Sequence, residues 1–190
     1  MARGRPSKKQ LILDTALDLF SKAGFQGTSI DLVVQKAGVS KPTVYNNFPT
    51  KQALLSELVE LLLSKAQAER QVLLENKEGL STSALLVAAF KKMSDDPAYT
   101  CLYRIFYGEC HKLDQDVQEQ LSQLDQDLKI WVSQLLEQRL CQPDEMLVLM
   151  LFAVCRELTL IPVLSGEQPM ANERLVARVQ SAIDKLESSE

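Results

Sequence analysis

Residues 28–51 carry the sequence TSIDLVVQKAGVSKPTVYNNFPTK. Apolar residues recur at helical spacing through its first third, and Gly38 then suits the left-handed conformation in which many helices end. Ser40 is a preferred cap for a following helix, and Pro42 falls in that helix's first turn, where a missing N–H group costs little. The stretch therefore predicts two short helices joined by a tight turn.

The first helix of the pair is predicted to begin at Thr28, which is a good N-cap residue. Asp31 follows three residues later, so the two residues have the form of a capping box with Asp in place of the commoner Glu. Helix formation from this point is thus expected from local signals alone.

The second helix, residues 41–48, is predicted to turn Val44 and Phe48 inward, because they stand four residues apart on one face. Its outer face is polar and holds Lys41, Thr43, Tyr45, Asn46 and Asn47. Two helices in this layout are typical of a helix-turn-helix, whose second helix enters the major groove of DNA. Asn pairs with adenine, Thr contacts a thymine methyl group, and Lys reaches guanine or phosphate. The alternative interpretation is an ordinary small helix with a solvated polar face.

Two longer segments resemble the TetR/AcrR family of transcriptional regulators. Residues 37–55, AGVSKPTVYNNFPTKQALL, resemble its signature, in which a Gly-Val-Ser turn precedes Thr-x-Tyr-x-x-Phe and then Lys and Leu. Residues 12–30, ILDTALDLFSKAGFQGTSI, resemble the usual first helix with its Gly-x-x-Gly-Thr-(Ser/Thr) link. Asn47 stands where many relatives have His. The resemblance implies a three-helix domain that binds double-stranded DNA.

The chain opens with Arg3-Gly4-Arg5-Pro6, which resembles an AT-hook. Arginines on such an arm suit a narrow A·T-rich minor groove, and the alternative is a disordered solvating tail. Lys51 stands near the N-terminus of the next helix, where backbone N–H groups and the helix dipole already favour a phosphate. The predicted DNA contacts are Arg3, Arg5, Thr28, Ser29, Ser40, Lys41, Pro42, Thr43, Tyr45, Asn46, Asn47 and Lys51.

Composition predicts an all-α protein. The 190 residues are 46% hydrophobic and 24% charged, and no run of alternating β-branched residues bounded by turns is present. Periodic Leu-, Gln-, Glu- and Ala-rich segments predict about nine helices in total. Three of them form the N-terminal helix-turn-helix domain, residues 1–51, and the others form a larger ligand-binding and dimerisation domain, residues 52–190. A long fourth helix, about residues 51–74, bridges the two.

The net charge of −4 divides unevenly along the chain. Residues 1–51 hold eight Lys or Arg and three Asp, a balance of +5, whereas the remainder holds thirteen basic and twenty-two acidic residues, a balance of −9. Phosphate binding needs local positive charge, so this division favours DNA binding by the first domain.

The stretch 97–112 combines aromatic residues with Arg104, Glu109 and His111. Aromatic walls with a few polar anchors are typical of a ligand pocket, and the resemblance implies a small-molecule effector in this domain. The predicted ligand-binding residues are Tyr103, Arg104, Tyr107 and Trp131. The alternative is a core helix whose charged groups are exposed or paired.

The last two helices are predicted to form a homodimer interface. The very apolar helix predicted over residues 144–161 includes the run MLVLMLFAVC at 146–155. This helix has more apolar surface than one side of a monomer core needs, and the resemblance implies a four-helix bundle made from two copies. The predicted interface residues are Leu149, Phe152, Leu160, Leu175, Val179 and Ile183. The run is too short to cross a membrane, and a cytoplasmic location is expected.

Four cysteines, Cys101, Cys110, Cys141 and Cys155, show no C-x-x-C pairing, and His111 is the single histidine. Reduced thiols are expected, with a redox-sensing pair near Cys110 as the alternative. We expect no metal site, no cofactor and no catalytic residues, because no acid–base pair or nucleophile motif is present.

Together these features predict a dimeric transcriptional repressor that a small hydrophobic ligand releases from a near-palindromic operator. The alternative is a DNA-bound platform of the same fold that a protein partner regulates without a small-molecule inducer.

Deletion of residues 1–6 tests the predicted arm. We expect DNA affinity to fall by about tenfold at A·T-flanked sites and less elsewhere, because the arm's charge acts in the minor groove. Gel-shift titrations with A·T- and G·C-rich flanks at fixed salt measure the effect. An equal change in affinity at all flanks would show that the arm is only a solvating tail.

Overall fold

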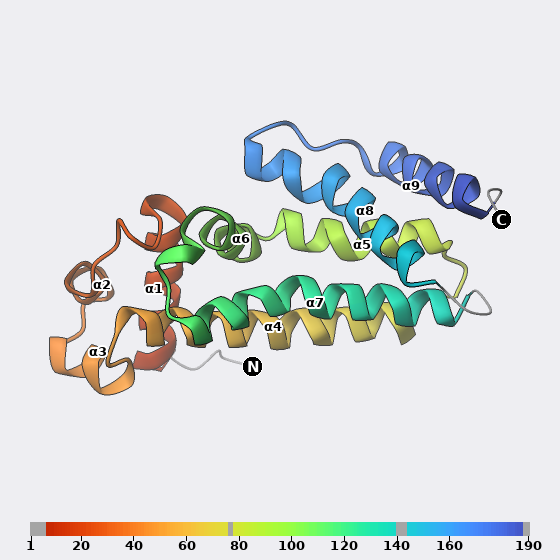
Figure 1. Cartoon of the computed structure of the whole chain (residues 1–190). Helices are drawn as coiled ribbons and strands as arrows, with labels where there is room; N and C mark the ends of the chain where they lie inside the picture. Colours follow the sequence, from red (N-terminus) through yellow and green to blue (C-terminus); the bar gives the residue numbers. More distant parts are fainter. Residues whose placement is uncertain (1–6, 76–77, 140–143, 188–190) are drawn as a thin grey trace, which may run out of the picture. The chain divides into compact units, whose positions relative to one another are not determined.

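The computed structural model describes residues 7–75, 78–139 and 144–187. Within these residues it has nine α-helices, one short 3-10 helix and no strand (Figure 1), which confirms the predicted all-α fold. The helices are α1 (Lys8–Ala23), α2 (Ile30–Ala37), α3 (Lys41–Asn47), α4 (Lys51–Glu75), α5 (Thr82–Asp95), α6 (Pro97–Glu109), η1 (Cys110–Lys112), α7 (Gln115–Glu137), α8 (Glu145–Ser165) and α9 (Asn172–Glu187).

The chain forms two compact units. Unit 1 contains residues 1–62 and 101–122, and unit 2 contains residues 63–100 and 123–190. Helices α4, α6 and α7 therefore each contribute residues to both units. These units reflect compactness and join residues 101–122 to the N-terminal helices. They do not test the functional boundary predicted after residue 51, which stays a prediction.

Serine side chains cap the first turns of α1, α2, α3 and α5. In each case the hydroxyl oxygen of Ser7, Ser29, Ser40 or Ser81 accepts a hydrogen bond from the N–H group three residues on. Such a cap satisfies one of the N–H groups that a helix leaves without an internal partner. Local chemistry thus fixes where these helices begin.

The predicted N-cap of α2 was wrong by one residue. Ser29, not Thr28, is the cap, and its hydroxyl accepts from the Leu32 N–H group at 3.1 Å. The Thr28 side chain is 1% exposed and donates to the Gly24 carbonyl oxygen at 2.9 Å. Asp31 consequently lies in the first turn of α2 but does not complete a capping box with Thr28.

In unit 1, α1, α2 and α3 pack against one another. Apolar side chains of all three helices are fully buried, among them Ile12, Val33 and Val44. Phe20 of α1 packs on Phe25, with ring centroids 5.4 Å apart. This small core sets the angle between the two helices of the helix-turn-helix.

In unit 2, α5 packs against α8 and α9, and these two also contact each other. Five of the six residues predicted for a dimer interface are buried inside this single chain, at 6% exposure or less: Phe152, Leu160, Leu175, Val179 and Ile183. These five residues are therefore core residues of the chain itself, which corrects their prediction as interface residues. Leu149 alone among the six is exposed, at 48%.

Helix α8 is longer than predicted. It contains Pro162, continues to Ser165 and ends at Gly166, whose φ is 77°. With 21 residues and a mean hydropathy of 2.1 over its most apolar window, α8 is long and apolar enough to cross a membrane by length and composition alone. One third of that window is buried inside the protein.

Phe152→Ala should lower the free energy of unfolding by about 3–5 kcal/mol, because it leaves a cavity beside Phe90, whose ring centroid lies 5.8 Å away. Urea denaturation followed by circular dichroism measures this. The matched control is Ile130→Ala on α7, which is 55% exposed and should change stability by no more than about 0.5 kcal/mol. Equal effects of the two substitutions would contradict the burial of Phe152.

Candidate nucleic-acid interface

Helices α2 and α3 form the predicted helix-turn-helix. Gly38 ends α2 in the left-handed conformation, at φ 63°, and Ser40 caps α3 two residues later. Val44 and Phe48 are buried at 0% and 2% exposure, and the Phe48 N–H group caps the end of α3 by donating to the Val44 carbonyl oxygen at 2.8 Å. One side of α3 is thus fixed in the core, and its other side faces solvent.

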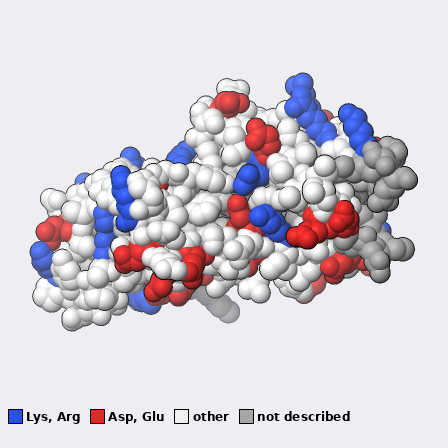
Figure 2. Space-filling view, viewed as in Figure 1, with Lys and Arg blue, Asp and Glu red and all other residues white. Residues whose placement is uncertain are grey.

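The solvent side of α3 presents most of the predicted DNA contacts. Lys41, Pro42, Asn46 and Asn47 are exposed, Tyr45 is 42% exposed, and Thr43 is half-buried. Ser29 and Ser40, at the starts of α2 and α3, are also exposed. Figure 2 shows Lys and Arg side chains spread over the surface of α1 to α3, with acidic side chains among them.

Three residues of this surface, Ser40, Thr43 and Asn47, take part in local hydrogen bonds. The hydroxyl groups of Ser40 and Thr43 lie 2.7 Å apart, and the Asn47 amide nitrogen donates to the Thr43 carbonyl oxygen at 2.7 Å. Within the described part of the chain, the Asn46 side chain makes no hydrogen bond. Its amide is therefore available for the bidentate pairing with adenine that Asn favours.

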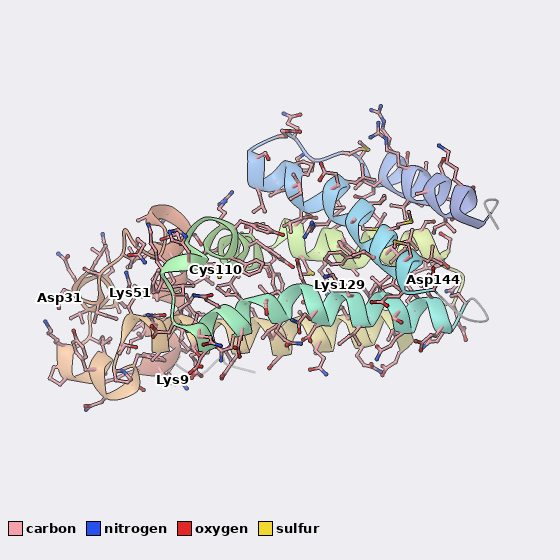
Figure 3. All side chains as sticks on the ribbon, in the orientation of Figure 1. Lys9, Asp31, Lys51, Cys110, Lys129 and Asp144 are labelled. Atoms are coloured by element: carbon pink, nitrogen blue, oxygen red, sulfur yellow. The ribbon has the colours of Figure 1, made fainter. Side chains whose placement is uncertain are left out.

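Lys41 is paired with a carboxylate across the helix-turn-helix. Its ammonium lies 2.7 Å from Asp31 of α2, which is labelled in Figure 3, and 5.7 Å from the centre of the Tyr45 ring. The hydrogen bond to Asp31, together with the charge of that carboxylate, raises the pKa of Lys41. Because both side chains are more than half exposed, this pair is weak and screened by salt, and Lys41 stays accessible to DNA.

Lys51 does not have the surroundings predicted for a phosphate ligand. Its ammonium donates to the carbonyl oxygens of Phe25 and Thr28, at 2.7 and 2.8 Å, and lies 4.2 Å from the centre of the Phe25 ring. Burial lowers the pKa of Lys51, and the nearby charge of Glu109 opposes that shift. We correct its role to that of an internal anchor for the connection between α1 and α2.

Thr28 is the other predicted DNA contact that the structure contradicts, because its side chain is 1% exposed and bonded to Gly24. Arg3 and Arg5 lie outside the described residues. The remaining predicted contacts, at the starts of α2 and α3 and along α3, are exposed or half-buried: Ser29, Ser40, Lys41, Pro42, Thr43, Tyr45, Asn46 and Asn47.

The predicted ligand-binding residues are divided between the units. Tyr103, Arg104 and Tyr107 of α6 belong to unit 1, where Tyr103 is buried at 1%, Arg104 is exposed, and Tyr107 is 49% exposed. The rings of Tyr103 and Tyr107 stack with centroids 6.0 Å apart. Trp131 belongs to unit 2, is 3% exposed, and donates its indole N–H to the Arg70 carbonyl oxygen at 3.0 Å.

Trp131 borders a hollow of about 370 Å³ between α4 and α7 of unit 2. The other lining residues are Gln67, Arg70, Gln71, Asp127, Ile130 and Gln134. The Arg70 guanidinium is nearly buried and lies 3.9 Å from the Asp127 carboxylate. This lining mixes an indole and an isoleucine with several amide groups, so the hollow is more polar than the predicted hydrophobic pocket.

Three of the four cysteines lie in the described residues as free thiols. Burial raises the pKa of Cys101 and Cys110, and it raises that of Cys155 to about 12. A redox-sensing thiol needs a lowered pKa, so these three have the opposite character. Cys141 lies outside the described residues.

Two residues of unit 1 acquire roles that sequence reasoning missed. Asp31 is the partner of Lys41, and Glu109, at the end of α6, hydrogen-bonds to backbone groups more than eighty residues earlier in the chain. A contact of that sequence separation leaves no local signal in a single sequence. For Asp31, its position in the first turn of α2 was the only available sign.

The fold and this surface define a helix-turn-helix DNA-binding protein. Residues 12–58 match the family model described as bacterial regulatory proteins, tetR family. This match places the helix-turn-helix of the chain in the tetR family of bacterial regulatory proteins.

Curated relatives are similar to this chain over part of its length. The uncharacterized HTH-type transcriptional regulator YvkB of Bacillus subtilis strain 168 is 41% identical over 75 residues, which cover 40% of this chain and 37% of that protein. The HTH-type transcriptional regulator RutR of Escherichia coli strain K12 is 38% identical over 74 residues, which cover 37% and 35%. The chain thus spans little more than a third of the length of these relatives.

Solved structures resemble the chain over nearly its whole length. A transcriptional regulator of the TerR/AcrR family from Aquifex aeolicus VF5 has a TM-score of 0.71 at 21% identity and covers 95% of this chain and 99% of its own. Reduced Escherichia coli NemR has a TM-score of 0.72 at 19% identity and covers 92% and 96%. At these identities the likeness establishes the fold.

Proposed function

We propose that the protein is a cytoplasmic, dimeric transcriptional repressor that reads a near-palindromic operator with α3 of each copy. The observation that carries the proposal is the division of α3 into two sides. Val44 and Phe48 are buried, while Lys41, Tyr45 and Asn46 face solvent on a helix short enough to enter a major groove.

The outward side chains offer complementary means of reading DNA. The Asn46 amide suits an adenine edge, and the Lys41 ammonium suits guanine or phosphate once it exchanges Asp31 for DNA. Ser29 and Ser40 stand at helix N-termini, where hydroxyl and backbone N–H groups suit phosphates. In this proposal α3 makes the base contacts, and phosphate contacts at the starts of α2 and α3 fix the position of α3 along the groove.

Dimerisation is supported by the outer face of α8. Met146, Leu149 and Met150 are 53%, 48% and 43% exposed and lie on neighbouring turns of the same helix. A contiguous apolar surface of this kind is typical of an association site. We propose that a second copy covers it, which would give two α3 helices related by a two-fold axis, as a near-palindromic operator requires.

A small ligand with both apolar and polar groups releases the protein from DNA in this proposal, because the hollow in unit 2 has a more polar lining than the hydrophobic pocket predicted from the sequence. The hollow beside Trp131 and Ile130 in unit 2 supports a ligand site there, and its carboxamides supply polar anchors. Release requires only that the ligand bind more tightly to a state that binds DNA poorly. A coupling of about 1–3 kcal/mol changes operator affinity by roughly 5- to 150-fold.

Lys41→Ala and, separately, Tyr45→Ala should each weaken operator binding by about tenfold while leaving the fold intact, since both side chains are exposed on α3. The operator is first recovered by selection from random duplexes, and gel shifts at fixed salt then measure affinity.

The control for the lysine variant is Lys22→Ala. Lys22 is also exposed, in unit 1, and is paired with a carboxylate, Asp18, at 2.7 Å. Unchanged affinity in both α3 variants, or an equal loss in the control, would remove α3 as the reading helix.

Leu149→Glu should raise the dimer dissociation constant by about tenfold or more without unfolding the chain, because it places a charge on the proposed interface. Sedimentation velocity measures the change. Ile130→Glu, at a comparably exposed site on α7, is the control and should leave assembly unchanged. A dimer of unaltered strength in Leu149→Glu would refute the interface on α8.

A further inference from the structure

Glu109, the last residue of α6, binds the backbone between α1 and α2. Its carboxylate oxygens accept hydrogen bonds from two successive amides: Oε1 from the Phe25 N–H group at 3.0 Å and Oε2 from the Gln26 N–H group at 2.7 Å. Hydrogen bonds to an ionised carboxylate are about twice as strong as those between neutral groups. All three residues belong to unit 1, and Figure 3 labels Cys110, the next residue after Glu109, near α1.

Gly24 makes room for this carboxylate. Its φ is 74°, a conformation that side chains disfavour, and a Cβ atom at this position would lie 2.9 Å from Glu109 Oε1. The glycine therefore serves two purposes at once, since it both ends α1 and lets an anion approach the following amides.

Lys51 holds the same connection through its carbonyl groups. Its ammonium donates to the carbonyl oxygens of Phe25 and Thr28, while the Thr28 hydroxyl donates to the Gly24 carbonyl oxygen. Phe25 is thus bound at its N–H group by an anion from α6 and at its carbonyl group by a cation from α4. We call this arrangement of Glu109 and Lys51 the turn clamp.

We propose that Glu109 is a positioning residue for DNA binding, which acts by fixing the connection between α1 and α2 through the turn clamp. The connection leads directly into α2, and α2 carries the turn and α3. If the connection is free to move, the reading helix must be ordered when DNA binds, and that ordering lowers affinity. Glu109 lies outside the residues 12–58 that match the family model.

The sign of the expected effect separates positioning from simple electrostatics. Glu109 is an anion in the unit that binds DNA, so loss of its charge alone would strengthen attraction to phosphates. If Glu109 acts by positioning, Glu109→Gln should instead weaken operator binding, because the Gln side chain has one acceptor oxygen for the two amide donors. The inference rests on the proposed DNA-binding function. Amide exchange in the free protein tests the turn clamp separately, without DNA.

The experiment compares full-length wild type with Glu109→Gln, Glu109→Asp and the control Glu119→Gln at one ionic strength. Glu119 is an exposed carboxylate of α7 in the same unit, hydrogen-bonded to Gln115, so its substitution removes the same charge without touching the connection. Gel shifts with the selected operator and with random duplex measure affinity. Hydrogen exchange by NMR measures protection of the Phe25 and Gln26 amides.

In Glu109→Gln we expect the operator dissociation constant to rise about tenfold and the exchange of both amides to accelerate about tenfold or more, whereas binding to random duplex is unchanged or tighter. Glu109→Asp, which keeps the charge on a shorter side chain, should recover part of the loss. Glu119→Gln should leave amide protection and the operator-to-random affinity ratio as in wild type.

Wild-type operator affinity in Glu109→Gln, with accelerated amide exchange, would overturn the inference while leaving the proposed function in place. Unaltered exchange would overturn the turn clamp itself. If Glu109→Gln does not fold, as judged by circular dichroism, Glu109→Asp decides by the same two readouts. A wild-type protein that binds no duplex at low salt would instead refute the proposed function, and the exchange rates would still test the clamp.

Discussion

The burial of Val44 and Phe48 is the constraint on which the rest of the DNA-reading surface depends. A helix of seven residues is too short to be stable in water on its own, so α3 exists because these two side chains are held at 0% and 2% exposure in unit 1. Burial of one face also fixes the rotation of the helix about its axis. Lys41, Tyr45 and Asn46 face solvent for that reason, and the reading surface is a consequence of the core.

The connection between α1 and α2 shows how the same unit holds backbone groups that lie beside its hydrophobic core. Backbone groups of the connection would lack hydrogen-bond partners if they were removed from water. Two charged side chains supply these partners: the Lys51 ammonium donates to carbonyl groups, and the Glu109 carboxylate accepts from amide groups. Lys51 thus illustrates that a basic residue near a helix start can serve the fold itself. Its charge contributes to the +5 of residues 1–51 but is turned inward.

Features set by neighbours in the chain could be predicted from sequence. The left-handed glycine at 38 and the serine cap at 40 were both confirmed, because each depends on a few consecutive residues. Thr28 and Ser29 can both cap a helix, and the choice between them depends on tertiary packing, which buries Thr28. Glu109 stood in an aromatic stretch that favoured a pocket, and its actual partners, Phe25 and Gln26, are too distant in sequence to be recognised.

Helix α8 shows the limit of periodicity most clearly. An apolar stripe predicts that side chains are buried but does not say whether their own chain or a second copy covers them. The chain itself buries Phe152 and Leu160 against α5 and α9, yet Met146, Leu149 and Met150 on the same helix stay exposed. The apolar residues of α8 lie on more than one side of the helix, and each of these sides requires burial. The chain's own core accounts for one side, and the proposed dimer accounts for the other.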